Sequence, residues 1–384
     1  MTLPLPTVER FLLGPGPSMI APRVMRALAA PVLGHLDPDL LALMDETRAQ
    51  LMRLFRAPSG SVALAVSGTG SSGLETVVAN LVQPGTRVLS IVNGYFGDRL
   101  GQVCARYGAD VTRLDGEWGR SFEPARVREA LGRQAADIVC VVHAETSTGV
   151  RNPIEEIAHA AHERGALVVV DAVTSLGGQP VEMEKWGIDA CYSCTQKCVG
   201  APPGLAPVAF SPSALARRVP CRSFYFDLGL LEDYWQRRKY HHMISASLVY
   251  ALHEALVAIE EEGLEARWQR HERHHRVLAA SLEAMGLGLL PPDGERLWTL
   301  NAVKVPPGVD EASVRRDLLE RFNMEIGAGL GPLGGKIWRV GLMGASSTSQ
   351  AILYFLAALE AALGRAGHDT RNGAGTAAAL AAMR

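Results

Sequence analysis

The chain has few cysteines, almost no excess of charge of either sign and no long hydrophobic run. Its six cysteines in 384 residues are too few for a disulfide framework, and most lie in apolar segments, so we expect free thiols and a reducing cytoplasm. The formal net charge of -2 is spread along the chain, which leaves no basic stripe for nucleic acid and no polybasic block for a membrane surface. No apolar run approaches the ~20 residues that a helix needs to span a bilayer.

The two ends of the sequence carry no address signal. The first residues, MTLPLPTVERFLLGPGPS, lack the positive segment and unbroken apolar stretch of a signal peptide. The last residues, AAMR, do not form the peroxisomal S-K-L signal. A cytoplasmic location therefore stays the expectation.

Between residues 61 and 210, short apolar runs alternate with amphipathic segments. Such alternation predicts an α/β domain with a mostly parallel sheet and helices on both faces, and continuously apolar runs fit strands that are buried on both sides. The expected strands are 61–66, 87–92, 136–144, 166–171, 190–194 and 206–211, and the expected helices are 73–81, 99–107, 124–131 and 153–163.

The later part of the chain has a different organisation. A long, charge-rich helical stretch is expected over 248–285, followed by a smaller α+β unit and a Gly/Ala-rich tail of uncertain order. The length suits two domains. We predict an N-terminal arm (1–21), a large domain (22–262), a small C-terminal domain (263–366) and a tail (367–384).

Two segments of the α/β region place reactive side chains near strand ends. In ALVVVDAVTSLGG, Asp171 follows an apolar run, at the carboxyl edge where open α/β sheets bind ligands, although an aspartate there can also cap a turn. In SCTQKCVGAPPG, Lys197 follows another short strand, where partial desolvation would make its amine a nucleophile. A pyridine cofactor needs this pair, an acid at its ring nitrogen and an amine at its aldehyde.

The segment AVSGTGSSGLETVVANLV lies between an expected strand and an expected helix. Its free N–H groups and hydroxyls indicate a phosphate site, but Gly68, Gly70 and Gly73 also match the dinucleotide motif G-x-G-x-x-G. That motif expects an acidic residue at the end of the next strand, and here the strand runs into Asn93-Gly94-Tyr95-Phe96-Gly97. An aromatic pair suits a flat ring better than a ribose.

Two motifs resemble metal-binding sites, but we expect neither to bind a metal. His271-Glu272-Arg273-His274-His275 matches the zinc-protease motif H-E-x-x-H, yet its neighbours are charged on nearly every helical face, so we interpret it as a solvated helix. Cys191, Cys194 and Cys198 lack a second ligand pair, and no metal site is expected.

Arg339, in the apolar strand of GGKIWRVGLMG, indicates either a structural salt bridge or a clamp for a substrate carboxylate.

In this order, the segments resemble the class V, fold type I aminotransferases, in particular the alanine–glyoxylate and serine–glyoxylate (or serine–pyruvate) branch. The resemblance spans nearly the whole chain through LLGPGPS, GHLDP, SGTG, NGYFGDR, HAETSTGV, VDAVTSLGG, SCTQKCVGAPPG, YHH and GLGPLGGKIWRVGLMG. It implies a large domain with a mostly parallel seven-stranded sheet, a smaller α+β C-terminal domain, and a homodimer with shared active sites.

The resemblance also implies a cofactor, pyridoxal 5'-phosphate, and a role for each matching residue. Lys197 would bind it as a Schiff base, and Asp171 would bond the ring nitrogen. Phe96 and Val173 would cover the two ring faces, and Thr146 would reach the ring hydroxyl. The phosphate would lie on Thr69, Gly70, Ser71 and Gln196, with Tyr240 reaching in from the neighbouring subunit, and Arg339 would hold the substrate carboxylate. Met243 departs from a frequent threonine, and Ser71 differs from the bulkier polar residue of some relatives.

The implied reaction is a ping-pong transamination from a small amino acid, alanine or serine, to glyoxylate or pyruvate. Two sister branches stay open. Pyridoxamine–pyruvate aminotransferase carries an arginine where this chain has Leu330, and the ureidoglycine–glyoxylate branch tends to have Gln and Asn in place of His35 and Tyr240. A cysteine desulfurase or other lyase on the same fold and a dinucleotide-binding dehydrogenase are more distant alternatives.

Overall fold

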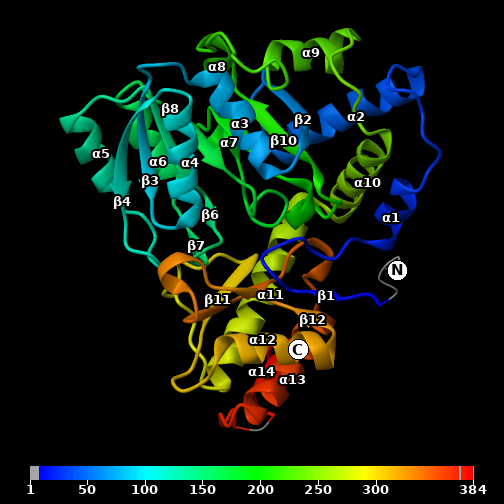
Figure 1. The fold of residues 1–384 in the computed structure, drawn as a ribbon, viewed down its shortest axis with the longest axis vertical. Helices are drawn as coiled ribbons and strands as arrows, with labels where there is room; N and C mark the ends of the chain where they lie inside the picture. The colour runs from blue at the N-terminus through cyan, green and yellow to red at the C-terminus, as the bar shows by residue number, and fades with distance from the viewer. Residues whose placement is uncertain (1–7, 372, 384) are drawn as a thin grey trace, which may run out of the picture.

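The computed structural model describes residues 8–371 and 373–383. Its main body is built on a seven-stranded sheet with the order β2-β10-β9-β8-β5-β3-β4 (Figure 1). The strands are β2 (Val62–Gly68), β3 (Arg87–Val92), β4 (Asp110–Asp115), β5 (Ile138–Val142), β8 (Leu167–Asp171), β9 (Ala190–Tyr192) and β10 (Gly204–Phe210). Neighbours from β9 to β4 are parallel, and β10 is antiparallel to both β2 and β9. The predicted mostly parallel α/β fold is confirmed.

The six expected strands are all present, with ends that shift by up to two residues. The seventh, β4, was not expected, because its sequence DVTRLD contains only two apolar residues. It pairs only with β3 at the edge of the sheet, and none of its residues is fully buried. An edge strand of this kind lacks the continuous apolar run that marks the central strands.

Two of the four helices expected in the main body begin three or four residues earlier than the apolar periodicity suggests. The helices of this body are α1 (Pro22–Leu28), α2 (Pro38–Leu54), α3 (Gly70–Leu81), α4 (Tyr95–Arg106), α5 (Pro124–Arg133), α6 (Ile154–His162), α7 (Met183–Trp186), α8 (Pro212–Ala216) and α9 (Leu228–Arg237). Two short strands, β6 (Ala144–Glu145) and β7 (Val150–Arg151), form a separate hairpin. The first turn of α3 is polar and glycine-rich, so a search for amphipathic periodicity overlooks it.

The helical stretch expected over 248–285 is two helices. They are α10 (Ala246–Glu262) and α11 (Leu264–Ala284), and they are separated at Gly263, which has a φ of +81°. That backbone conformation favours glycine and ends a helix. In Figure 1, α11 runs from the main body down into the smaller unit.

The smaller unit has its own sheet and its own hydrophobic cluster. Its sheet has the order β11-β14-β13, and its elements are β11 (Leu300–Lys304), α12 (Glu311–Phe322), β12 (Met324–Glu325), β13 (Gly327–Ala328), β14 (Ile337–Gly341) and α13 (Ser349–Arg365). A large cluster of buried apolar residues fills the main body, and a second one fills this unit. The two clusters fit a two-domain molecule, and the exact domain boundaries stay a prediction.

The tail contains a further helix, α14 (Ala374–Ala382), which packs against α11 and α13. Ala379 of this helix is fully buried, so the tail adds to the core of the smaller unit. No helix among residues 8–371 and 373–383 is long and apolar enough to cross a membrane.

The N-terminal arm connects the two parts of the molecule. Its short strand β1 (Phe11–Leu12) pairs in parallel with β12, and Leu13 joins the smaller cluster. A few residues later, the Ser18 hydroxyl donates to the carbonyl of Lys197 over 2.9 Å. The arm therefore reaches from the small unit to the lysine singled out in the sequence.

Candidate active site

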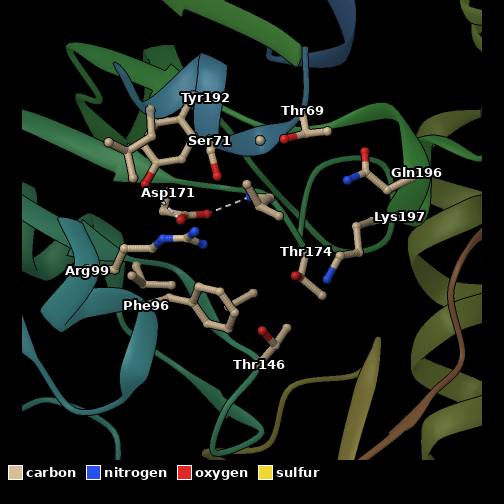
Figure 2. A pocket seen from close by; sticks show the side chains of 15 residues that line it. Thr69, Ser71, Phe96, Arg99, Thr146, Asp171, Thr174, Tyr192, Gln196 and Lys197 are labelled. Carbon is tan, nitrogen blue, oxygen red and sulfur yellow. Dashed lines mark hydrogen bonds between the residues drawn. The ribbon is translucent and has the colours of Figure 1, made fainter. Parts of the chain in front are cut away.

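A pocket opens at the carboxyl edge of the central sheet. Figure 2 shows Asp171 and Lys197 on opposite sides of it, Thr69 and Ser71 along one margin, and Phe96 and Thr146 along another. Its lining residues are Thr69, Gly70, Ser71, Leu74, Phe96, Arg99, Val142, Ala144, Thr146, Asp171, Val173, Thr174, Tyr192, Gln196 and Lys197. All the residues predicted to bind the cofactor line this one pocket, apart from Tyr240.

Asp171 is the last residue of β8 and is buried, with 6% of its surface exposed. Its Oδ1 accepts the N–H of Val173 over 2.8 Å, and its Oδ2 accepts the hydroxyl of Tyr192 over 2.8 Å. Burial raises the pKa of Asp171, whereas these two donors and the charges of Lys197 and Arg99 lower it. The donors hold the carboxylate in one orientation at the strand end.

Lys197 lies in the irregular turn Thr195–Val199 that follows β9, and its own φ and ψ are not helical. Its Nζ donates to the carbonyl of Pro15 in the N-terminal arm. Desolvation by the surrounding protein lowers the pKa of this amine below its ordinary value of 10.5. The lysine is therefore a better nucleophile at neutral pH than an exposed lysine.

The start of α3 forms another wall of the pocket. Thr69, at its N-cap, makes no side-chain cap hydrogen bond, and the first N–H groups of any helix have no acceptor within that helix. A Cβ at Gly70 would lie 3.0 Å from Cγ2 of Val173, so glycine lets the helix start approach the residue beside Asp171. Free N–H groups and hydroxyls here suit an anion such as phosphate.

Arg339 lies in β14 of the smaller unit, close to the pocket but outside its lining. Only 7% of the residue is exposed. Its Nε donates to the carbonyl of Ala328 over 2.6 Å, and its Nη1 lies 3.5 Å from the carbonyl oxygen of Thr146. No carboxylate of the described residues lies within 4 Å of this guanidinium, so the structural salt bridge considered above is absent from that part of the chain.

Tyr240 lies away from the pocket in the single chain. It is 61% exposed, and its ring meets that of His35 edge-on with 5.1 Å between centroids. The neighbouring Met243 is 71% exposed. Both residues are free to meet another molecule.

Four further residues belong to the site and were not singled out in the sequence. Arg99, Thr174 and Tyr192 line the pocket, and Glu145 accepts the N–H of the lining residue Phe96. Arg99 follows Phe96 by three positions on α4, which places both on one helix face. Tyr192 is the register partner of Asp171 on the adjacent strand. The helix spacing of Arg99 and the strand register of Tyr192 could identify these residues only once the helix bounds and the strand order were known.

Glu145 joins two walls of the pocket. Its Oε2 accepts the N–H groups of Phe96 and Gly97, at 3.2 and 3.1 Å, and its Oε1 accepts the N–H and hydroxyl of Ser147, at 3.1 and 2.5 Å. Burial raises the pKa of this carboxyl to about 7, although its donors oppose the rise. Because Gly94 at the N-cap of α4 has no side chain, Glu145 caps that helix from a distant segment.

Comparison with known proteins agrees with this geometry. The family model for class V aminotransferases matches residues 10–332. The chain is similar to the ureidoglycine–glyoxylate aminotransferase of Bacillus subtilis, with 40% identity, a TM-score of 0.95 and 99% of both chains covered. It is also similar to an alanine–glyoxylate aminotransferase of Nostoc sp., with 44% identity, a TM-score of 0.92, and 94% of this chain and 97% of the other covered. The alanine–glyoxylate aminotransferase of Drosophila melanogaster is 34% identical over 370 residues, or 94% of each chain.

This chain belongs to the class V aminotransferases. Family membership confirms the predicted family and fold type I, and it removes the dinucleotide-binding dehydrogenase as an alternative. The desulfurase alternative needs a mobile catalytic cysteine. All six cysteines of the aminotransferase are free thiols, and five of them are buried.

The solvated helix expected around the H-E-x-x-H motif is wrong. In the aminotransferase this segment lies in α11, and His271, His274 and His275 are at most 5% exposed. Their ring nitrogens bond within the protein, as when Nδ1 of His275 lies 2.7 Å from Oδ1 of Asn301. Packing against the smaller unit buries one face of this segment, although all five residues of His271-Glu272-Arg273-His274-His275 are polar. Among residues 8–371 and 373–383, no group of three or more His, Cys, Asp or Glu side chains could hold a metal ion.

Proposed function

We propose that this aminotransferase carries pyridoxal 5'-phosphate on Lys197 and transfers the amino group of alanine or serine to glyoxylate or pyruvate in a ping-pong reaction. One observation carries the proposal: the desolvated amine of Lys197 and the buried carboxylate of Asp171 face the same pocket. These are the amine and the acid that a pyridine aldehyde cofactor requires.

The other lining residues fit that cofactor. The first N–H groups of α3 and the nearby hydroxyls would hold its phosphate. The side chain of Gln196 has no hydrogen-bond partner among the described residues, so its amide N–H group can donate to the phosphate. The proposed contacts are Thr69, Gly70, Ser71 and Gln196 to the phosphate, Thr146 to the ring hydroxyl, and Phe96 and Val173 to the ring faces.

When bound, the cofactor supplies an electron-withdrawing ring that stabilises negative charge at the substrate Cα. Asp171 would hold the proton at the ring nitrogen. The amine of Lys197 would take the proton from Cα and return it, since its lowered pKa leaves a larger neutral fraction near pH 7. Deep placement in the pocket would keep bulk water away from these groups.

Arg339 would bind the substrate carboxylate. Its guanidinium is buried, and its hydrogen bonds in the chain go to two backbone carbonyls. A carboxylate in reach would supply the charge partner that such a cation lacks. A single clamp of this kind suits alanine, serine and glyoxylate better than dicarboxylic acids.

The proposal also specifies the amino donor. The second candidate for the reaction is ureidoglycine–glyoxylate transamination. The likeness to the Bacillus subtilis enzyme over 99% of both chains favours that second candidate. His35 and Tyr240, whose rings touch, favour the alanine or serine donor, because the ureidoglycine branch tends to have amide residues there. The pyridoxamine–pyruvate alternative is disfavoured by Leu330, which stands where that branch has an arginine.

We also propose a homodimer in which Tyr240 of each subunit reaches the phosphate in the other. Two large apolar side chains near this tyrosine are exposed, since Phe224, whose ring packs against His241, and Met243 are each 71% exposed. Exposed apolar clusters of this kind mark protein interfaces. A cytoplasmic location is proposed on the six free thiols.

The test is the visible spectrum of the purified protein after pyridoxal phosphate is supplied. We expect a band that alanine or serine bleaches and that glyoxylate restores, and no such band in Lys197→Ala. Absence of a band from the wild type would refute the cofactor assignment. Bleaching by ureidoglycine but by neither alanine nor serine would move the enzyme to the sister branch.

A further inference from the structure

Tyr192 and Asp171 form a buried hydrogen-bonded pair at the edge of the sheet. The parallel register of β8 and β9 places the two residues side by side at the strand ends. The Tyr192 hydroxyl donates to Oδ2 of Asp171 over 2.8 Å, and the tyrosine is only 1% exposed. Both residues line the pocket in which the ring would bind (Figure 2).

The pair leaves room for one more partner of the carboxylate. Oδ1 is bonded to the N–H of Val173 and Oδ2 to the tyrosine hydroxyl, while a carboxylate offers about four acceptor positions in all. The carboxylate can therefore accept a ring N–H without losing either of these donors. Two fixed donors also prevent it from rotating away from the ring.

Hydrogen bonding decides where a shared proton resides. In a desolvated site, a carboxylate and a protonated pyridine nitrogen compete for one proton, and the neutral pair is favoured by the low dielectric. A hydroxyl that donates to the carboxylate stabilises the ionised form and makes it a weaker base. The proton then stays on the ring, where it is needed to stabilise charge at Cα.

We propose that Tyr192 is a positioning residue that orients the Asp171 carboxylate and keeps it ionised, so that the bound ring retains its proton. The inference rests on the proposed function, since it requires a pyridine cofactor at Asp171. Tyr192 touches the acid and acts on the ring through it.

The surroundings of Tyr192 suit this role. Burial and the charge of Asp171 raise the pKa of the phenol well above its ordinary value, so it stays protonated and can donate at any working pH. Its position is fixed by close packing, because a Cβ at Gly73 would lie only 3.2 Å from the Cβ of Tyr192. Gly73 thus lets α3 lie close to β9, and α3 is the same helix whose start is proposed to hold the phosphate.

The test is Tyr192→Phe, which removes one oxygen and keeps the ring. The matched control is Tyr234→Phe, since Tyr234 is equally buried but donates to the carbonyl of His35, outside the pocket. Two quantities are measured on each protein: the dissociation constant of pyridoxal phosphate from the apoprotein, and the nitrogen chemical shift of cofactor labelled with 15N in the ring.

We expect Tyr192→Phe to weaken cofactor binding by about tenfold, the usual scale for a lost hydrogen bond to a charged group. The ring nitrogen should shift toward the value of an unprotonated pyridine, and Tyr234→Phe should match the wild type. Wild-type affinity and an unchanged nitrogen shift in Tyr192→Phe would overturn the inference. Failure of the wild type to bind the cofactor would overturn the proposed function and the inference together.

A second variant covers the case in which Tyr192→Phe does not fold. Site-specific replacement of Tyr192 by 3,5-difluorotyrosine keeps the shape and makes the hydroxyl a stronger donor. The ring nitrogen should then become more fully protonated, and its titration should move to higher pH. A titration that moves to lower pH or stays in place would contradict the proposed role.

Discussion

Gly16 lies directly against the side chain of Lys197. A Cβ atom at position 16 would lie 2.6 Å from Cε and 3.2 Å from Nζ of the lysine. The φ of Gly16 is +124°, a backbone conformation that residues with a side chain rarely adopt. Since Pro15 accepts a hydrogen bond from the same Nζ, the N-terminal arm shapes the space in which the lysine must move.

Gly16→Ala should therefore impair cofactor capture. The new methyl group must displace either the arm or Lys197, so we expect the affinity for pyridoxal phosphate to fall at least tenfold, on the order of 1.4 kcal/mol. The measurement is titration of the apoprotein with cofactor, followed by visible absorbance. Gly34→Ala is the control, because a Cβ there has nothing within 4 Å. Equal affinities of the two variants would show that the arm does not constrain the lysine.

Arg339→Gln should raise KM for the amino acid and for the keto acid. Loss of a buried charge partner for a carboxylate costs about 2–5 kcal/mol, so we expect KM to rise by at least about thirtyfold, with cofactor affinity unchanged. Arg339→Lys keeps the charge and loses the two-pronged geometry, and it should fall in between. Arg365→Gln, at an exposed pair with Asp317, serves as control. A wild-type KM in Arg339→Gln would remove the arginine from substrate binding.

His275 should make folding sensitive to acid. Burial lowers its pKa from 6.5 to about 4. Between these two pH values the unfolded chain binds a proton at His275 and the folded protein does not. Stability is therefore complete above pH 6.5 and declines as the pH falls toward 4. The free energy of unfolding is measured in urea for the apoprotein at pH 7, 6 and 5. In His275→Gln the slope of this free energy against pH should be smaller by the equivalent of up to one bound proton. His159→Gln, at an exposed histidine, should leave the slope unaltered, and the idea fails if both variants behave alike.

Glu145→Gln should destabilise the start of α4. An amide can accept at only one end, so some of the four donors around Glu145 would face another donor, at a cost of about 1–3 kcal/mol. Because Phe96 lies in the affected turn, cofactor affinity should fall as well. Urea unfolding gives the first quantity and cofactor titration the second. Glu129→Gln, at an exposed helix pair, is the comparison, and identical stabilities would rule out the capping role.

The sequence-based predictions were accurate where they depended on neighbouring residues in the sequence. They failed where they depended on contacts between distant parts of the chain. Asp171 was recognisable because a buried parallel strand is a continuous apolar run and a charged residue marks its end. Lys197 and the start of α3 were recognisable by similar short motifs. Glu145 and Tyr192 were missed, because each acts on a residue at least 21 positions away in sequence, across a strand pair or a helix start. His271 and His275 were misjudged, since their burial depends on a surface contributed by the small unit.

The sequence by itself determined six strands of the central sheet, the family, and the acid and amine at the carboxyl edge, Asp171 and Lys197, because these follow from local apolar patterns and short motifs. Only the tertiary structure decided which side chains the pocket desolvates, which acceptor each donor meets, and how the N-terminal arm lies over Lys197. Desolvation and hydrogen bonding depend on everything that surrounds a group, and the neighbours that matter here come from distant parts of the chain.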